Sequence, residues 1–113
     1  MNILRTSQRE SHQNSETLVV YEYPMNDADI NGAVSHLNGR YPVQGFAVNE
    51  KCKEMAYVIK GSGKIVVDHV EIPVGPGDLL IISPGEKYYW HGDLDLFLSC
   101  TPAWYAGQHK IIR

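Results

Sequence analysis

Turn-forming residues divide this 113-residue chain into short segments, and their spacing constrains the fold more than any other feature. Glycine, proline and asparagine recur at short intervals, and the segments between them are apolar, aromatic or β-branched. No window of useful length has the 3.6-residue period of an amphipathic helix. About eight short strands at this spacing predict an all-β sandwich or barrel.

Two hairpins are the clearest local predictions. Gly61-Ser62-Gly63 separates two strand-like runs and is typical of a three-residue hairpin loop. Asp68-His69 separates Val67 from Val70 and suits a tight turn. The expected strands are Leu18–Tyr23, Ala33–Leu37, Val43–Asn49, Glu54–Lys60, Lys64–Val67, Leu79–Ile82, Lys87–His91 and Leu94–Cys100.

The chain is long enough for one domain, which we expect to span residues 17–113. Residues 1–16 are polar and predict a flexible tail, or an arm that orders on a partner. The formal net charge is −3 and no basic block is present, which disfavours a nucleic-acid partner. No membrane-binding helix, signal peptide or apolar span is evident, so we expect no membrane partner and a cytoplasmic location. Cys52 and Cys100 are expected to be free thiols.

The run Glu54–Lys60 is apolar on both faces, because Met55, Tyr57 and Ile59 alternate with Ala56 and Val58. Leu79–Ile82 has the same character. A strand buried on both faces needs cover beyond the barrel interior. The N-terminal strand of the same chain or a second subunit would supply it, and we expect a homodimer.

Two motifs resemble those of the cupins. Glu54 and Gly61 have the glutamate-to-glycine spacing of the first cupin motif, and Gly77 and Gly85 match the glycines of the second. Pro84 stands one place later than the usual proline. The flanking segments 39–42 and 100–104 are also similar to a subgroup of small bacterial and archaeal cupins, a likeness that implies no reaction. The resemblance implies a single-domain cupin-type jelly-roll β-barrel.

The metal ligands that the resemblance implies are mostly replaced in this chain. Cupins hold a divalent metal through two histidines and the glutamate of the first motif and a histidine of the second. With a four-residue spacer the first two places fall on Ala47 and Asn49, and with three residues on Val48 and Glu50. The last falls on Tyr88. Only Glu54 remains, and a lone carboxylate with an amide and a phenol is a poor transition-metal site, so we expect no tightly bound metal and no cofactor.

The resemblance places Glu54 inside the barrel, where burial would raise the pKa of its carboxyl group and suit it to proton transfer. Strand alternation puts Tyr88 and Trp90 on the same face as each other, and His91 on the opposite one. We therefore expect a small-molecule site in which Asn49, Glu54, Tyr88 and Trp90 contact the ligand, with Glu54 and Tyr88 as candidate catalytic groups. His109 near the C-terminus would join this site only by folding back over the barrel.

Three functions remain open at this stage. The first is a binding module for a small polar ligand, of sugar or organic-acid type, in the barrel interior. The second is a metal-independent enzyme of the sugar epimerase or isomerase kind that uses Glu54 or Tyr88. The third is a metal-dependent isomerase, dioxygenase or decarboxylase whose ligands have moved to His91, His36 or Cys100. Fold alone does not choose among them.

Overall fold

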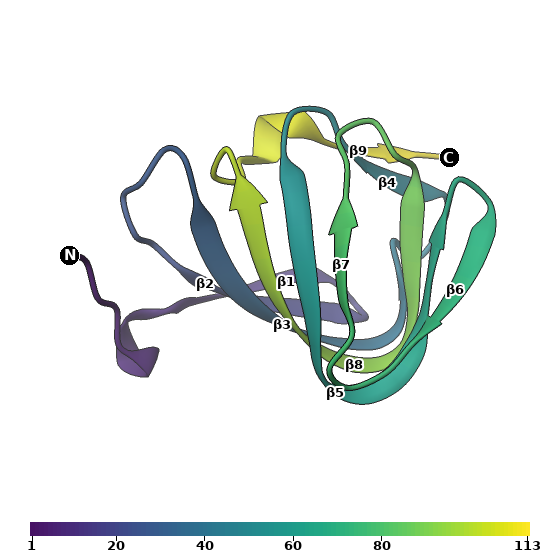
Figure 1. Ribbon diagram of the computed structural model, residues 1–113, viewed down its shortest axis with the longest axis horizontal. Helices are drawn as coiled ribbons and strands as arrows, with labels where there is room; N and C mark the ends of the chain where they lie inside the picture. The colour runs from purple at the N-terminus through teal and green to yellow at the C-terminus, as the bar shows by residue number, and fades with distance from the viewer.

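The computed structural model describes all 113 residues and is built almost entirely from antiparallel strands (Figure 1). Its two helices, η1 (Thr6–Gln8) and η2 (Ala106–Gln108), are single turns, and neither has the length or apolarity to span a bilayer. The strands are β1 (Glu10–Ser15), β2 (Leu18–Tyr23), β3 (Asn31–Tyr41), β4 (Phe46–Asn49), β5 (Lys53–Val67), β6 (Val70–Val74), β7 (Leu79–Ile82), β8 (Tyr88–Thr101) and β9 (His109–Ile112). The predicted all-β jelly-roll barrel is confirmed.

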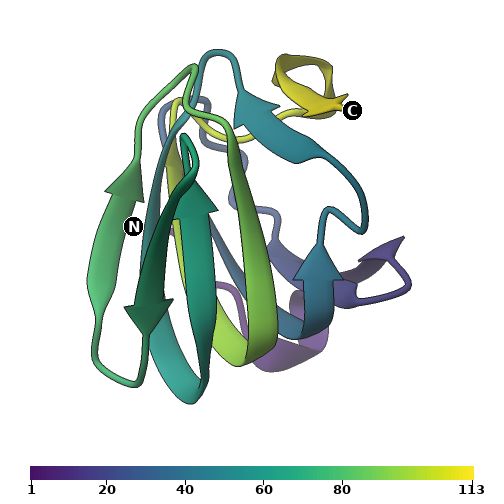
Figure 2. The same cartoon turned by 90° about the vertical axis from the view of Figure 1, so that its right-hand side faces the viewer.

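Strand β8 is the centre of the sheet, since it pairs with β3 along one edge and β5 along the other for most of its length. On one side of β8 the sheet continues from β3 to β2 and then β1. On the other side, β6 and β7 pair with the two halves of β5. In Figures 1 and 2, β5 and β8 bend together at the lower end of the molecule, so that the sheet curls around one interior.

The bend corrects two sequence predictions. Gly61-Ser62-Gly63 is not a hairpin loop but part of β5, opposite residues 92–94 of β8. The expected strands 87–91 and 94–100 are likewise one strand, which passes through Gly92. A Cβ on Gly61, which has φ +93°, would overlap the carbonyl oxygen of Asp93. Glycine serves here for the close approach of two bent strands, where the sequence pattern indicated a turn.

Other local predictions hold. Asp68 and His69 form the two-residue turn between β5 and β6, both with positive φ, as a type I′ hairpin requires. Leu79–Ile82 is β7 with the predicted bounds. The predicted tail differs in its second half, because Glu10–Ser15 form β1 and pair with β2. The pattern there is entirely polar, and the strand is stabilised by backbone pairing with β2 rather than by an apolar face.

The core lies inside the curl, where alternate residues of β3, β5 and β8 meet. Leu37, Val58, Leu94 and Leu96 are almost fully buried there, within a cluster of 14 buried residues. The alternate residues of the same strands face outward, as the period of two in a strand requires. The C-terminal segment, yellow in Figure 1, returns to the barrel so that β9 pairs with β4. This return brings Gln108 and His109 beside Asn49.

Candidate functional site

A cavity lies inside the curl and is partly open to solvent. Eleven of its 17 lining residues are hydrophobic, contributed mainly by β2, β3 and β8. The other six are Asn14, Glu22, Asn31, Ser35, Glu54 and His109. Among the eleven, the side chains of Tyr41, Tyr88, Trp90, Cys100 and Trp104 each carry one polar atom. No lysine or arginine lines the cavity, so the site offers no permanent positive charge to a bound anion.

Glu54 lies at the surface of this cavity, on the inward face of β5. Only 8% of the residue is exposed. Burial raises the pKa of its carboxyl group above the usual value. The thiol of Cys100 and the amide of Asn49 oppose this shift by donating to its two oxygens, at 3.4 Å and 3.5 Å. A carboxyl group with a raised pKa is suited to hold or transfer a proton.

Tyr88 and Trp90 also line the cavity, while His91 on the same strand is exposed on the outer face. Burial and the nearby Glu54 raise the pKa of the Tyr88 phenol well above its usual value, so the group is a neutral hydroxyl. Tyr89, next to Tyr88, faces outward and carries the Arg40 guanidinium 3.8 Å above its ring. The predicted alternation of this strand is therefore present in the structure.

Asn49 is fully buried but does not line the cavity. It lies behind the wall, in contact with Glu54, Gln108 and His109. Together with Ala47, whose register partner is Tyr88, it occupies the inward face of β4. Of the two spacings the sequence allowed for the first cupin motif, the structure thus agrees with the one that assigns Ala47 and Asn49.

The cavity has two further polar residues: Tyr41, which the sequence did not indicate, and His109, which joins it through the fold-back of the C-terminal segment. The Tyr41 hydroxyl lies 2.9 Å from Nε2 of His109, and the His109 Nδ1 lies 2.9 Å from Oδ1 of Asn49. Burial raises the pKa of Tyr41 to about 12, with a smaller contribution from Glu54. Burial also lowers the pKa of His109, so its ring is neutral at pH 7.

Ser35 supplies an isolated polar atom deeper in the cavity. Its hydroxyl is buried, lines the cavity and has no hydrogen-bond partner in the protein. Its neighbours on the inward face of β3 are Ala33 and Leu37, so the surroundings are apolar. A buried hydroxyl without a partner is costly, and a bound ligand or water would satisfy it.

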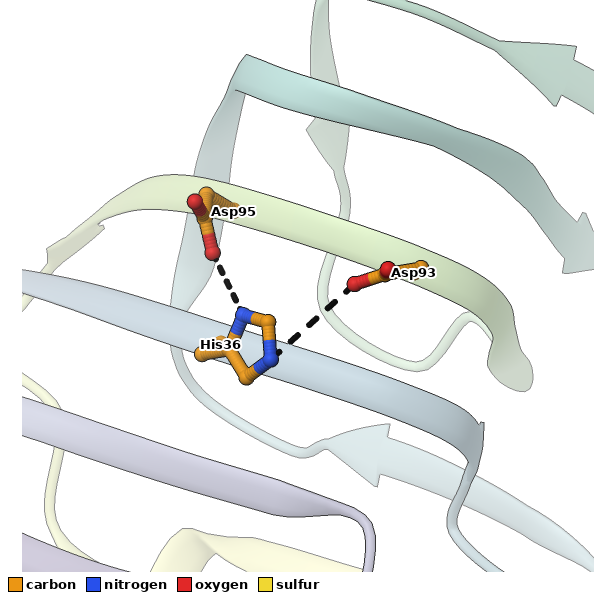
Figure 3. Close-up of polar contacts among 3 residues, drawn as sticks. All are labelled: His36, Asp93 and Asp95. Atoms are coloured by element: carbon orange, nitrogen blue, oxygen red, sulfur yellow. Dashed lines mark hydrogen bonds and ion pairs between the residues drawn. The ribbon is translucent and has the colours of Figure 1, made fainter.

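The residues proposed as relocated metal ligands are not brought together. His36 is exposed on the outer face of β3, with Nδ1 2.6 Å from Oδ1 of Asp95 and Nε2 4.0 Å from Oδ1 of Asp93 (Figure 3). His91 is exposed on β8, while Cys100 is buried inside the barrel. No group of three or more histidine, cysteine, aspartate or glutamate side chains in the protein has the geometry to hold a metal ion.

The places that hold the metal in cupins also do not fit a transition metal here. Glu54 offers one carboxylate, Tyr88 a phenol that burial keeps protonated, and Asn49 an amide whose oxygen already accepts two hydrogen bonds. The neighbouring His109 uses both ring nitrogens in hydrogen bonds. This donor set lacks the free imidazoles or thiolates that such ions prefer.

Comparisons with known proteins agree with the fold. The family profile described as Cupin domain matches residues 42–96, just under half of the chain. Its structure is similar to that of Pac13, described as a unique nucleoside dehydratase, with a TM-score of 0.89, 17% identity, and 100% of this chain and 92% of that one covered. A variant of the Streptomyces protein with uridine gives a TM-score of 0.86 and 18% identity over 96% of this chain and 88% of that one.

More distant structures share the same barrel. KdgF from Halomonas sp. has a TM-score of 0.74 and 11% identity, covering 90% of this chain and 94% of that one. Ectoine synthase from P. lautus has a TM-score of 0.73 and 13% identity, covering 100% and 91%. No curated protein matches the sequence. At these identities the likeness establishes the fold, and the chemistry must be argued from the residues of the cavity.

Proposed function

We propose that the protein binds a small, uncharged, hydroxyl-bearing ring compound in the cavity, with Glu54 as the group that contacts its polar side. The observation that carries this proposal is the cavity lining. A buried carboxyl group and the hydroxyls of Tyr41 and Tyr88 lie in a wall without any lysine, arginine or protonated histidine. Of the ligand types that the sequence suggested, this lining favours a sugar-like compound over an organic acid.

The physical reason is the cost of burying an unpaired charge. A carboxylate or phosphate in this cavity would lose its hydration, meet no cation and lie near a second acid. A neutral diol would donate hydrogen bonds to the acidic wall, while the apolar face of its ring would pack on Trp90 and the leucines of β3 and β8. The nucleoside seen with the Streptomyces relative is a ligand of this chemical kind.

Matched pairs of compounds test the proposal. Thermal unfolding is measured with uridine and uridine 5′-monophosphate, and with glucose and glucose 6-phosphate. A neutral compound at about 100 times its Kd stabilises the fold by about 2.7 kcal/mol, which raises Tm by several degrees. The phosphorylated partner is expected to give no shift. Equal or larger shifts with the charged members would contradict the proposal.

A cavity-filling substitution identifies the place of binding. Ala33→Leu adds volume inside the cavity, whereas Val34→Leu enlarges a side chain, by a smaller volume, on the opposite face of the same strand. The ligand-induced shift should disappear in the first variant and persist in the second. Retention of the shift in Ala33→Leu would place the ligand elsewhere.

A second candidate is acid–base catalysis without a metal on the same ligand. It is favoured by the raised pKa of Glu54 and by the neutral Tyr41–His109 pair in the same cavity. Glu54→Gln separates the two functions, because an amide still forms hydrogen bonds but transfers no proton. Binding should persist in this variant, whereas turnover by proton transfer should fall at least ~100-fold.

We also propose that the protein is a homodimer. Apolar side chains cover the outer face of β5, β7 and β8, namely Met55, Tyr57, Ile59, Leu79, Ile81 and Phe97. They lie side by side, since Met55 pairs with Ile81 and Tyr57 pairs with both Leu79 and Phe97. A contiguous exposed apolar surface of this kind is typical of an interface.

We also propose a reducing, cytoplasmic location, which the two buried, unpaired thiols support.

A further inference from the structure

We propose that Gln108 is a positioning residue that fixes the direction of the hydrogen bonds linking Asn49 to Glu54 and, through His109, to Tyr41. Gln108 is only 1% exposed and does not itself line the cavity. Its side chain stands between two backbone amides and the side chain of Asn49. The proposal concerns the protein without ligand and does not depend on what the cavity binds.

The orientation of the Gln108 side-chain amide is set by two backbone N–H groups. The N–H groups of Lys51 and Cys52 lie 3.2 Å and 3.1 Å from one atom of the Gln108 amide. Backbone N–H groups only donate, so that atom is the oxygen and the NH₂ group faces Asn49. This NH₂ group also only donates, at 3.0 Å, so the atom of Asn49 that receives it is Oδ1. The Asn49 NH₂ group is thereby turned toward Glu54.

The same oxygen determines the protonation of His109. Because Asn49 Oδ1 only accepts, the His109 Nδ1 at 2.9 Å must carry a hydrogen. A neutral imidazole then has a bare Nε2, which accepts a hydrogen bond from the Tyr41 hydroxyl at 2.9 Å. The groups that face the ring are Asn49 from β4, Tyr41 from β3 and Trp104, whose ring centre lies 5.7 Å away. None of them is a carboxylate that would favour the imidazolium ion.

The network gives the wall a defined polarity. The Tyr41 hydrogen points to His109, so only lone pairs of its oxygen remain for a ligand. Glu54 receives an N–H from Asn49 rather than facing an amide oxygen. Under the proposed function, such a wall accepts hydrogen bonds from ligand hydroxyls. Without the Gln108 contact, the Asn49 amide could turn and present its oxygen to Glu54.

The test is nitrogen NMR of the ligand-free protein labelled with ¹⁵N-histidine, because protonated and bare ring nitrogens resonate far apart. Between pH 7 and pH 8, above the usual histidine pKa of about 6.5, His109 is expected to show a protonated Nδ1 and a bare Nε2. The Nε2-protonated tautomer as the main species would overturn the proposal. The exposed His36 and His91 serve as internal references.

Two variants test the part played by Gln108 itself. Gln108→Met removes both its acceptor and its donor, so the His109 resonances should move toward a mixture of tautomers. Gln44→Met, on an exposed residue without a side-chain contact, should leave them unchanged. An unchanged His109 tautomer in folded Gln108→Met would overturn the assignment.

If Gln108→Met does not fold, Gln108→Glu decides. When protonated, the new carboxyl group keeps one acceptor and one donor, so the Nδ1-protonated tautomer is kept. When ionised, it has no donor for Asn49, and the Nδ1-protonated tautomer should be lost. Carbon NMR of the new carboxyl group reports its ionisation. If the His109 tautomer stays the same when this group ionises, the proposal is overturned. Loss of the ligand-induced Tm shift with an unchanged tautomer would count against the proposed function alone.

Discussion

The Cys100 thiol lies 3.4 Å from Oε2 of Glu54, on the residue directly opposite it in the pairing of β5 with β8. This contact favours the ionised form of Glu54, yet the carboxyl pKa is still raised, because burial outweighs it. The thiol in turn has its pKa raised, first by burial and then by the nearby acid. Glu54 therefore helps to keep the thiol protonated, whereas the thiol partly offsets the effect of burial on the pKa of Glu54.

The stability of the protein should therefore depend on pH through Glu54. Its pKa in the folded state is above the unfolded value of about 4.5, so its contribution is fully present below pH 4.5 and is lost as pH rises through the folded pKa. Relative to Glu54→Gln, wild-type stability should fall as pH rises, by about 1.4 kcal/mol for each unit of pKa shift. Urea unfolding between pH 4 and pH 8, roughly the range that brackets this shift, measures it.

Glu50→Gln, on an exposed carboxylate, is the matched control for this experiment. Its difference from wild type should not change with pH in the same direction. A constant difference between wild type and Glu54→Gln across the pH range would show that the carboxyl group is not desolvated in the folded protein.

Ser35→Ala should separate stability from binding. The Ser35 hydroxyl has no partner in the protein, so its removal should leave the free energy of unfolding unchanged or raise it by about 1 kcal/mol. Ser99→Ala is the matched control, because its hydroxyl donates to the Asn31 carbonyl oxygen at 2.9 Å and its loss should destabilise by about 1 kcal/mol. If a ligand bonds the Ser35 hydroxyl, affinity should fall by about tenfold in Ser35→Ala. Destabilisation equal to that of Ser99→Ala would reveal a partner for Ser35.

Tyr41→Phe removes the hydroxyl that donates to His109 and faces the cavity. Because the ring is kept, packing should change little, while ligand affinity should fall by roughly tenfold, about 1.4 kcal/mol. Calorimetric titration with the neutral compound identified by thermal shift measures the loss. Tyr105→Phe, on an exposed ring, should bind as wild type does. Equal affinities for wild type and Tyr41→Phe would exclude this hydroxyl from the ligand contact.

Metal dependence can be tested by restoring the imidazoles. The wild-type protein should keep its Tm in the presence of a chelator, because its donor set suits no transition metal. The triple substitution Ala47→His, Asn49→His and Tyr88→His rebuilds three imidazoles around Glu54 and should gain Tm on addition of Zn²⁺ or Ni²⁺. Near-stoichiometric iron, nickel, manganese or zinc in the purified wild-type protein would contradict the expectation.

The proposed dimer predicts a mass of twice 12.7 kDa in light scattering at micromolar concentration. Ile81→Lys places a charge in the outer apolar face of β5, β7 and β8, and should yield the monomer with little change in folding. Val70→Lys, at an equally exposed apolar residue on β6, should remain dimeric. A wild-type monomer at high micromolar concentration would remove the proposal.

The fold was largely predictable because strand and turn signals are local. The exceptions concern glycine, whose sequence signal for a turn is the same as its signal for a bent strand under a close neighbour. Gly61 lies against β8 and Gly92 lies against β5 where the two strands bend. The residues next to each glycine in the sequence do not indicate this contact. Strand β1 was missed because it has no apolar face and depends on its neighbour.

The candidate site was predictable only where strand alternation applies. Glu54, Tyr88 and Trp90 lie at the cavity as the pattern indicated, since direction within a strand has a period of two. Asn49 lies behind the wall, because its amide is taken up by Gln108 and His109. Those two residues are far from Asn49 in sequence, and only the pairing of β9 with β4 brings them together.

That pairing has a consequence for the order in which the molecule is completed during synthesis. Strands β1 to β8 leave the ribosome before residues 108–112 do, because synthesis proceeds from the N-terminus. The amide of Asn49 stays unanchored until residues 108–112 have also emerged and closed over β4. The polar wall of the cavity is therefore incomplete in every nascent chain that lacks residues 108–112.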